Sequence, residues 1–320
     1  MNIIEFGDCR DIMRRWASEG VKAQTCVTSP PYYGLRDYGR DGQIGLEETP
    51  EEYIAAMVDV FRCVRDVLAD DGTVWLNIGD SYYNYRPGKG QALVKQSVAN
   101  NDQDLPQTCA RRGNKLDGLK EKDLIGIPWM LAFALRGDGW YLRQDIIWHK
   151  PNPMPESVQD RCTKAHEYIF LLSKSQKYYY DRMAIAEPAV YAEQHANKTT
   201  SWGNKKKDAG VKNNLEQYQQ TGIENNKTCL EGGMANKRSV WSVPVKPYSG
   251  AHFAVFPQEL IEPCILAGAP AGGIVLDPFM GSGTTAQVAQ NLGRQYIGCE
   301  LNTDYKPLQD KRVAQQSLVL

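Results

Sequence analysis

Residues 274–285, IVLDPFMGSGTT, constrain the fold of this chain more than any other stretch. An apolar run ends in Asp277, a glycine-rich turn follows at Gly281, Ser282 and Gly283, and two threonines open a helical pattern. Glycines in such a turn let backbone amides approach a ligand closely. No lysine precedes the threonines and no third glycine follows, so the turn matches neither a phosphate loop nor a dinucleotide fingerprint. The stretch predicts a strand–turn–helix unit of an α/β sheet.

The next predicted strand, 296–300, ends in an acid, Glu300. An acid about 20 residues beyond a glycine turn, at the end of the following strand, suits the two hydroxyls of a ribose. The turn and the acid together predict an adenosine-binding crevice. A plain turn without a ligand is the weaker interpretation, because it does not require so particular a string.

The rest of the chain alternates strands with helices, which predicts a doubly wound, mostly parallel α/β sheet. Thr49, Pro50 and Glu52 form a capping-box pattern at the start of one helix, and Gly72 is expected to end it. Strands are predicted at 2–6, 23–28, 73–78, 141–148, 168–172, 273–276 and 296–300, and helices up to residue 16 and at 51–68, 257–267 and 285–292. The hydrophobic content of 42% is globular, and no apolar run reaches the roughly 18–20 residues of a membrane span.

A second turn, TSPPY, follows the predicted strand at 23–28. Pro30 and Pro31 fix the backbone and remove two N–H donors, so the Ser29 hydroxyl and the Pro30 carbonyl can face a ligand as acceptors. Tyr32 adds a flat ring beside them. Two acceptors and a ring suit an exocyclic amino group on a planar base, although the turn alone is equally compatible with a simple tight loop. The adenosine crevice makes the base-binding interpretation the stronger one.

TSPPY, DPFMGSGTT and IGCELN together resemble the DNA amino-methyltransferases that use S-adenosylmethionine. The blocks GDCRDIM, WHKPNPMPES, HEYIFLLSK and HFAVFPQELIEPCI extend the resemblance to about two thirds of the chain. The catalytic turn precedes the cofactor turn, which is the β arrangement of this family. The resemblance implies a Rossmann-like methyltransferase fold with an inserted target-recognition region and a flipped target base.

Carried over residue by residue, the resemblance implies two sets of site residues. The catalytic turn is Ser29, Pro30, Pro31 and Tyr32. The cofactor site would be lined by Asp277, Phe279, Gly281, Ser282, Gly283, Thr284 and Glu300, with Asp8, Phe253 and Pro257 as secondary contributors. A valine at position 283 is expected to meet the cofactor. Trp148, Lys150 and Asn152 would lie at the rim of the base pocket or form a solvated strand end.

Two basic stretches interrupt the α/β pattern, although the chain as a whole has a net charge of −1. Residues 86–122 carry a net charge of +4 and residues 195–246 carry +5. By composition they are either solvated loops or nucleic-acid surface. The resemblance implies duplex DNA as partner, with phosphate contacts from Lys205, Lys206, Lys207, Lys227, Lys237, Arg238, Arg111 and Arg112.

The implied organisation is a catalytic part at 1–181 with a variable loop at 84–122, a target-recognition region at 182–246, and a cofactor-binding part at 247–320. Ser29 at the first position of the turn favours cytosine N4 as the methyl acceptor, with adenine N6 as the alternative. An RNA amino-methyltransferase and a non-catalytic DNA-binding relative are weaker alternatives. A homodimer and a cognate restriction endonuclease acting separately stay open.

Other chemistries are less compatible with the sequence. Cytosine carbon methylation needs a nucleophilic cysteine, and the one Pro-Cys pair, Pro263-Cys264, lies in an apolar helical run that indicates core. His149, His166, His195 and His252 do not complete a metal site with the cysteines, so no metal is expected. The eight cysteines are scattered, which indicates reduced thiols and a cytoplasmic protein of a bacterium or phage, without a membrane partner.

Overall fold

A computed structural model describes residues 1–35, 37, 39–83, 118–189, 234–245 and 256–314 of the 320-residue chain. Their contacts define two compact units: Met1–Tyr180 with Ser239–Leu320, and Asp181–Arg238. In the second unit a short strand β6 (Glu187–Pro188) pairs antiparallel with β7 (Met234–Ala235). The predicted division at residues 182 and 246 stays a prediction.

The first unit is built on an eight-stranded sheet in the order β1-β10-β9-β2-β3-β5-β4-β8. Neighbouring strands run parallel except at β5, which is antiparallel to both β3 and β4. The predicted fold class, a doubly wound and mostly parallel sheet, is therefore confirmed. The strands are β1 (Asn2–Phe6), β2 (Ala23–Thr28), β3 (Leu68–Ile78), β4 (Tyr141–His149), β5 (His166–Ser173), β8 (Val240–Ser242), β9 (Ile274–Asp277) and β10 (Gln295–Glu300).

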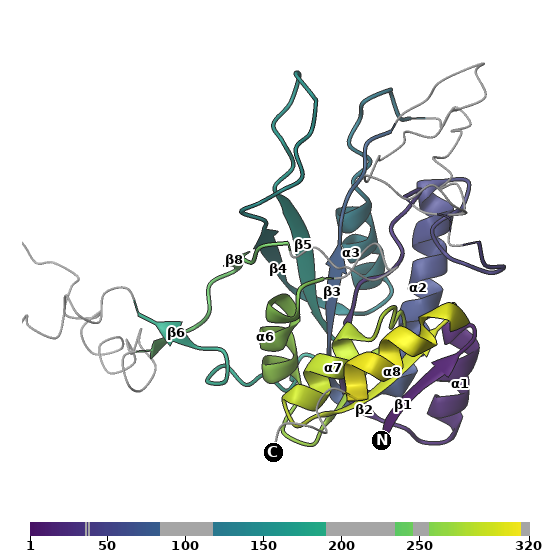
Figure 1. The fold of residues 1–320 in the computed structure, drawn as a ribbon, viewed down its shortest axis with the longest axis vertical. Helices are drawn as coiled ribbons and strands as arrows, with labels where there is room; N and C mark the ends of the chain where they lie inside the picture. The colour runs from purple at the N-terminus through teal and green to yellow at the C-terminus, as the bar shows by residue number, and fades with distance from the viewer. Residues whose placement is uncertain (36, 38, 84–117, 190–233, 246–255, 315–320) are drawn as a thin grey trace, which may run out of the picture. The chain divides into compact units, whose positions relative to one another are not determined.

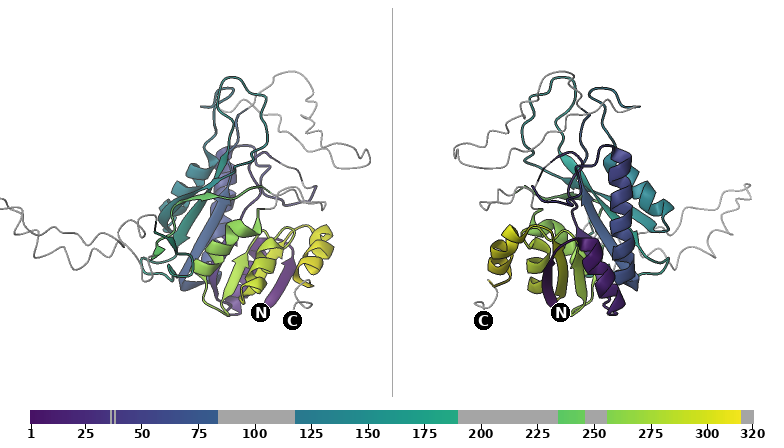
Figure 2. Two further views of the ribbon diagram at one scale, coloured as in Figure 1. Left: turned by 60° about the vertical axis from the view of Figure 1, so that its left-hand side comes forward. Right: turned by 90° about the vertical axis from the view of Figure 1, so that its right-hand side faces the viewer.

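Helices cover both faces of this sheet (Figures 1 and 2). One layer holds α1 (Cys9–Ser18), α2 (Pro50–Val67) and α3 (Ile127–Gly137). The other layer holds α6 (Gln258–Gly268), α7 (Thr284–Asn291) and α8 (Lys306–Ala314), and the short helix η2 (Thr303–Tyr305) precedes α8. Two covered faces explain why the central strands β2 and β9 are buried along almost their whole length rather than at alternate residues. Within the described residues, no helix is long and apolar enough to cross a membrane.

The capping box predicted for α2 is present, but the helix ends earlier than expected. Thr49 Oγ1 accepts the Glu52 amide at 3.1 Å, and the Glu52 side chain accepts the Thr49 amide at 3.1 Å. Gly72 was expected to end the helix, and this prediction is wrong: α2 ends at Val67. Leu68 is extended, fully buried and paired with Ala23, so the sheet takes over the backbone there. Gly72 is needed for space, because a Cβ on it would lie 2.9 Å from the Ala69 carbonyl.

Candidate active site

The two sequence turns lie at neighbouring strand ends in the middle of the sheet. β9 and β2 are parallel neighbours, with Cys26 opposite Leu276. From β9 the chain continues through α7 to β10 on one side, and from β2 it continues through α2 to β3 on the other (Figure 1). Ligands of open α/β sheets bind beyond the carboxyl ends of the strands at such a reversal of strand order. The fold therefore brings the predicted cofactor turn and catalytic turn together.

The buried side chain of Asp277 links the two turns through hydrogen bonds. Its Oδ1 accepts the Thr28 hydroxyl at 2.7 Å and the Phe279 amide at 3.0 Å, and its Oδ2 accepts the Thr285 hydroxyl at 2.6 Å. The side chain is 1% exposed, and this burial raises the pKa of Asp277 to about 6. The hydrogen bonds of Asp277 thus connect β9 to α7 and to the end of β2.

The glycine turn has the features of a ligand cradle. Gly281 and Gly283 have φ values of +54° and +87°, a conformation that favours glycine. Glu300 Oε2 accepts the Gly281 amide at 2.7 Å, and Oε1 accepts the Asn302 amide at 2.8 Å. Ser282 Oγ is buried and has no hydrogen-bond partner among the residues that the structure describes. A buried hydroxyl without a partner costs stability, so a bound polar group that pairs with it fits this position.

Burial also raises the pKa of Glu300, to about 7. Each carboxylate oxygen keeps a lone pair beyond the amide that it already binds, so Glu300 can accept two ribose hydroxyls. Phe279, beside the turn, is half-buried and packs against the core. The residues present therefore fit an adenosine-containing cofactor.

The C-terminal helix α8 supports the turn, which the sequence did not predict. Gln309 Nε2 donates to the Gly281 carbonyl at 2.7 Å, and Arg312 Nη1 donates to Thr284 Oγ1 at 2.7 Å. A Cβ on Gly283 would lie 3.3 Å from Gln309 Cα. A side chain at position 283 would therefore press on α8, and the expectation that it also meets the cofactor stays a prediction.

Gly283→Ala is expected to destabilise the protein more than Gly293→Ala. Both glycines have positive φ, but a Cβ on Gly293 meets nothing within 4 Å, whereas on Gly283 it presses on the Gln309 backbone. Backbone strain of about 1–3 kcal/mol is common to both variants, and the contact adds to it only at Gly283. Thermal unfolding of the two variants side by side measures the difference. Equal losses would show that α8 does not restrict this position.

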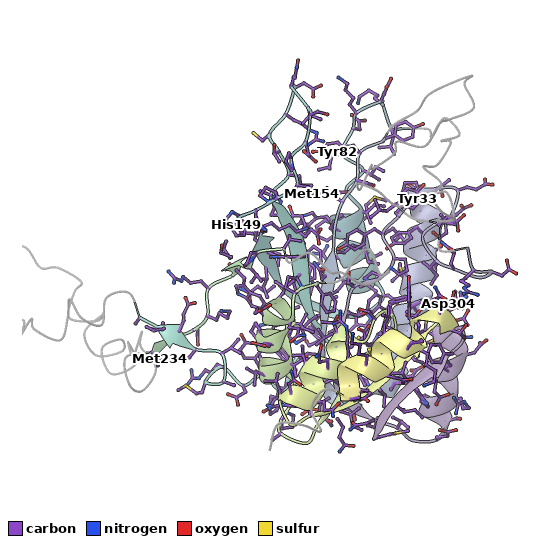
Figure 3. The ribbon with its side chains drawn as sticks, in the orientation of Figure 1. Tyr33, Tyr82, His149, Met154, Met234 and Asp304 are labelled. Carbon is purple, nitrogen blue, oxygen red and sulfur yellow. The ribbon has the colours of Figure 1, made fainter. Side chains whose placement is uncertain are left out.

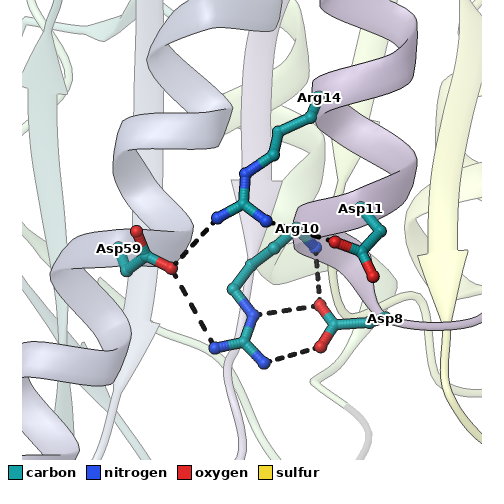
Figure 4. Close-up of polar contacts among 5 residues, drawn as sticks. All are labelled: Asp8, Arg10, Asp11, Arg14 and Asp59. Carbon is teal, nitrogen blue, oxygen red and sulfur yellow. Dashed lines mark hydrogen bonds and ion pairs between the residues drawn. The ribbon is translucent and has the colours of Figure 1, made fainter.

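Asp8, predicted to contact the cofactor, lies at the end of β1, beside β10. Its Oδ1 accepts the Arg10 amide at 2.8 Å, which caps α1, and Oδ2 pairs with Arg10 Nη2 at 2.6 Å (Figure 4). The Arg10 guanidinium lowers the pKa of Asp8. Asp59 of α2 pairs with Arg10 and Arg14 in the same cluster. Asp8 is thus an ionised helix cap at the start of α1, and its contact with the cofactor stays a prediction.

The remaining secondary contributors to the predicted cofactor site are placed only in part. Pro257 is buried and precedes α6 as its N-cap residue. Phe253 lies outside the described residues. Cys264 is 1% exposed within α6, so its interpretation as a core residue is confirmed.

The proline turn presents different groups at each position. The Pro31 carbonyl accepts the buried Tyr53 hydroxyl at 2.9 Å, whereas the Pro30 carbonyl accepts no hydrogen bond from the described part of the chain. The Tyr32 hydroxyl donates to Glu167 Oε2 at 2.8 Å. Ser29 Oγ and the Pro30 carbonyl therefore keep acceptor capacity for a ligand.

The sequence did not single out Glu167 as a functional residue, although it lies in the block HEYIFLLSK. It is half-buried near the start of β5 and pairs with Lys150, whose ammonium lies 4.3 Å from the Trp148 ring centroid. The acid in an otherwise apolar strand was the available signal. Tyr33, Tyr82, His149 and Met154 mark the same upper end of the sheet in Figure 3.

Two of the three residues proposed for the pocket rim bind the segment that follows the edge strand β8, and their place at the rim stays a prediction. Trp148 is buried and its Nε1 donates to the Val243 carbonyl at 2.8 Å. The Asn152 side chain forms two hydrogen bonds of 2.9 Å with the Val245 backbone. Only Lys150 turns toward the catalytic turn, through Glu167.

The predicted DNA contacts are mostly beyond what the structure describes. Lys205, Lys206, Lys207, Lys227, Arg111 and Arg112 lie outside the described residues. Lys237 and Arg238 belong to the second unit, where Arg238 pairs with Glu187.

Comparison with known proteins agrees with this geometry. Residues 23–311 match the N6/N4 DNA methylase family. The type II methyltransferase M.SmaI of Serratia marcescens is 46% identical over 310 residues, which are 97% of this chain and 90% of that protein.

Two solved structures share the fold. The cytosine-N4-specific PvuII DNA methyltransferase has a TM-score of 0.60 at 16% identity, over 99% of this chain and 88% of its own. The S-adenosylmethionine complex of a putative Thermus thermophilus DNA modification methylase has a TM-score of 0.58 at 20% identity, over 100% and 96%.

The fold and the paired turns define a Rossmann-like methyltransferase. The chain belongs to the N6/N4 DNA methylase family and is a type II DNA methyltransferase that uses S-adenosylmethionine. The predictions of DNA as substrate and of S-adenosylmethionine as methyl donor are confirmed at this level.

Proposed function

We propose that this methyltransferase transfers the methyl group to the exocyclic N4 of cytosine in duplex DNA. The observation that carries the proposal is the pair of open acceptors at the end of β2, Ser29 Oγ and the Pro30 carbonyl. Both are neutral, and two N–H donors of one amino group match them. Tyr32 supplies the ring face beside the target base. Such a base reaches the turn only when it leaves the duplex, at a cost of a few kcal/mol.

The chain's residues activate a poor nucleophile. The lone pair of an exocyclic amine is delocalised into the ring, and hydrogen bonds from its protons to Ser29 and Pro30 localise it on nitrogen. Fixed dipoles that stabilise developing charge contribute most at sites of this kind. S-adenosylmethionine, held by the glycine turn and Glu300, supplies the electrophilic methyl group. The fixed relation of the two turns, through Asp277, aligns amine and methyl.

Adenine N6 is the second candidate, since its amino group offers the same two donors. Sequencing of DNA from a methylase-free host that expresses this chain, with detection of modified bases, separates the two. N4-methylcytosine at one fixed sequence is expected. N6-methyladenine as the only new base would overturn the cytosine proposal and keep the site, whereas 5-methylcytosine would overturn both.

Glu300 should make cofactor binding depend on pH. Hydroxyl donors favour the ionised carboxylate, so binding lowers a pKa that stands at about 7 in the free protein. Affinity is therefore expected to rise as the pH increases from 6 to 7, with release of protons on binding at pH 6.5. Calorimetry in buffers of different ionisation enthalpy measures this release. Glu300→Gln is the control, because this variant still shows any proton release that comes from the ligand itself. Equal release in both proteins would exclude Glu300 as the ribose acceptor.

We also propose that residues 182–246 recognise the target sequence and that residues 84–122 lie near the duplex. Their net positive charge supports phosphate contacts. The type II designation of relatives such as M.SmaI supports a cognate endonuclease that acts separately.

Replacing Lys205, Lys206 and Lys207 by glutamine is expected to weaken DNA binding and flatten its salt dependence. Each lost phosphate contact lowers the slope of log K against log salt by about 0.9. Fluorescence anisotropy with a labelled duplex at several salt concentrations gives the slope. Lys22→Gln is the control, because Lys22 precedes the amino end of β2 and thus lies at the other end of this strand from the catalytic turn. A slope equal to that of the control would show that the cluster is a solvated surface.

A further inference from the structure

The ring of Tyr32 is held at its hydroxyl end by side chains of two paired strands, β3 and β5. Tyr32 Oη donates to Glu167 Oε2 at 2.8 Å, and Asn77 Oδ1 lies 3.4 Å from the same hydroxyl. Burial and the nearby Glu167 carboxylate raise the pKa of Tyr32, so the hydroxyl keeps its proton and acts as the donor. Hydrogen bonds to a charged acceptor are among the stronger ones, so this bond fixes where the far end of the ring lies.

The carboxylate that accepts from Tyr32 is itself fixed. Lys150 pairs with Glu167 Oε1 and leaves Oε2 to Tyr32. Asn77 is 5% exposed, and its Nδ2 donates to the Tyr168 carbonyl at 3.1 Å and lies 3.4 Å from Glu167 Oε2. Glu167 therefore has partners on both oxygens, and the antiparallel pairing of β3 with β5 sets their positions.

The backbone on either side of the ring adds to this restraint. A Cβ on Gly79 would lie 2.7 Å from Tyr32 Cε2 and 3.4 Å from Glu167 Cδ, so a side chain at position 79 would displace the ring. At the other end, the Pro31 carbonyl accepts the hydroxyl of the fully buried Tyr53 at 2.9 Å. The chain before the ring and the hydroxyl beyond it are thus both held, and neither contact involves the glycine turn.

We propose that Glu167 is a positioning residue that holds the Tyr32 ring in the orientation in which it stacks on the extruded target base. The inference rests on the proposed amino-methyl transfer, in which Tyr32 touches the base and Glu167 acts through Tyr32. Stacking of a base on an aromatic side chain contributes about 1–3 kcal/mol. It aligns the amine with the methyl group only if the ring does not turn. A ring that is already fixed in the free protein loses no side-chain freedom when the base arrives.

Two substitutions of Glu167 separate its hydrogen bond from its charge. Glu167→Ala and Glu167→Gln both leave Lys150 without its ion pair, but only glutamine keeps a group that bonds to Tyr32 Oη, through its oxygen or its amide. Single-turnover methylation of unmethylated plasmid DNA with labelled S-adenosylmethionine gives the transfer rates. Glu167→Ala is expected to slow transfer about 10-fold or more, because misplaced reacting groups cost that much, whereas Glu167→Gln should stay within about twofold of wild type. Equal losses in both variants would overturn the proposal.

Tyr32→Phe tests the same hydrogen bond from its donor. The variant keeps the ring and removes the hydroxyl, so its rate is expected to fall about as far as that of Glu167→Ala. The double variant should be no slower than the slower single one, because a bond that is already lost cannot be lost again. Single losses that multiply in the double variant would show that the two residues act independently, and would also overturn the proposal.

Glu5→Ala is the matched control for effects on the fold. Glu5 accepts from Trp16 Nε1 at 2.9 Å and pairs with Arg15, so this variant also removes the acceptor of a ring donor and an ion pair, but away from the catalytic turn. Thermal unfolding midpoints should fall in both Glu5→Ala and Glu167→Ala, whereas only Glu167→Ala should lose transfer rate. Calorimetric affinity for S-adenosylmethionine should be unchanged in both.

The outcomes distinguish this inference from the proposed function. A wild-type protein that methylates no DNA would overturn the proposed function. An active wild type whose folded Glu167→Ala and Tyr32→Phe variants keep the wild-type rate would overturn the positioning role alone. If Glu167→Ala does not fold, Tyr32→Phe decides the question, because it removes the same hydrogen bond and leaves the ion pair of Glu167 with Lys150 in place.

Discussion

Ser29→Ala is expected to lower the single-turnover rate of DNA methylation by at least about 10²-fold. The variant loses the acceptor for one amine proton at the moment when nitrogen attacks, and the loss of one fixed polar group at a transition state costs about 10²–10³ in rate. The Pro30 carbonyl remains, so residual transfer persists. Affinity for S-adenosylmethionine, measured by calorimetry, should stay at the wild-type value because Ser29 does not belong to the glycine turn.

Ser18→Ala is the matched control for this loss. Its hydroxyl is exposed and donates to the Arg15 carbonyl at the end of α1, away from the catalytic turn. Wild-type rates are expected there. Full activity in Ser29→Ala would show that the acceptor pair at the end of β2 is not what activates the amine.

Asp277→Leu is expected to cost several kcal/mol of unfolding free energy and to abolish measurable cofactor binding. The variant leaves the hydroxyls of Thr28 and Thr285 and the Phe279 amide without their buried acceptor, and each unpaired buried group costs about 1–3 kcal/mol. It also removes the side-chain hydrogen bond that connects β9 to the end of β2. Chemical denaturation and calorimetry measure the two losses. A folded Asp277→Leu variant with wild-type cofactor affinity would show that these hydrogen bonds do not support the cofactor site.

Asp277→Asn isolates the charge from the hydrogen bonds. Burial raises the pKa of the native carboxyl to about 6, so the folded protein binds this proton more tightly than the unfolded chain does. Its contribution to stability is full below its unfolded pKa near 4 and is lost as the pH rises through 6, a fall of about 3 kcal/mol. The Asn variant should lack this part of the fall between pH 4 and 6. Identical pH profiles for wild type and variant would exclude Asp277 as its source.

The sequence predicted several strands of the sheet well because a specific stop follows each of them. β1, β2 and β10 begin and end close to the predicted residues, and the end of β2 before Pro30 is fixed by a residue that cannot donate to a ladder. α3 was not predicted. Its N-cap residue, Gly126, has no side-chain cap, and Asp80, distant in sequence, binds the first amides instead. Such a long-range cap leaves no local signal.

The site was predictable as two motifs but not as a network. Asp277 and Glu300 stood out by position, yet their partners Thr28, Thr285 and the Gly281 amide depend on strand pairing. α8 carries little periodicity, so its contacts from Gln309 and Arg312 to the glycine turn could not be anticipated. Glu167 meets Tyr32 across 135 residues, and only the antiparallel placement of β5 beside β3 brings them together.

Mass spectrometry of nucleosides identifies the atom that receives the methyl group. Purified protein is incubated with unmethylated plasmid DNA and S-adenosylmethionine whose methyl group carries deuterium, and Ser29→Ala is run in parallel. One labelled nucleoside is expected, N4-methyldeoxycytidine with three deuterium atoms on its amino methyl group, with a strongly reduced yield in the variant. Label found only on a ring carbon, or no labelled nucleoside from a folded protein that binds the cofactor, would contradict amino-methyl transfer at the Ser29–Pro30 turn.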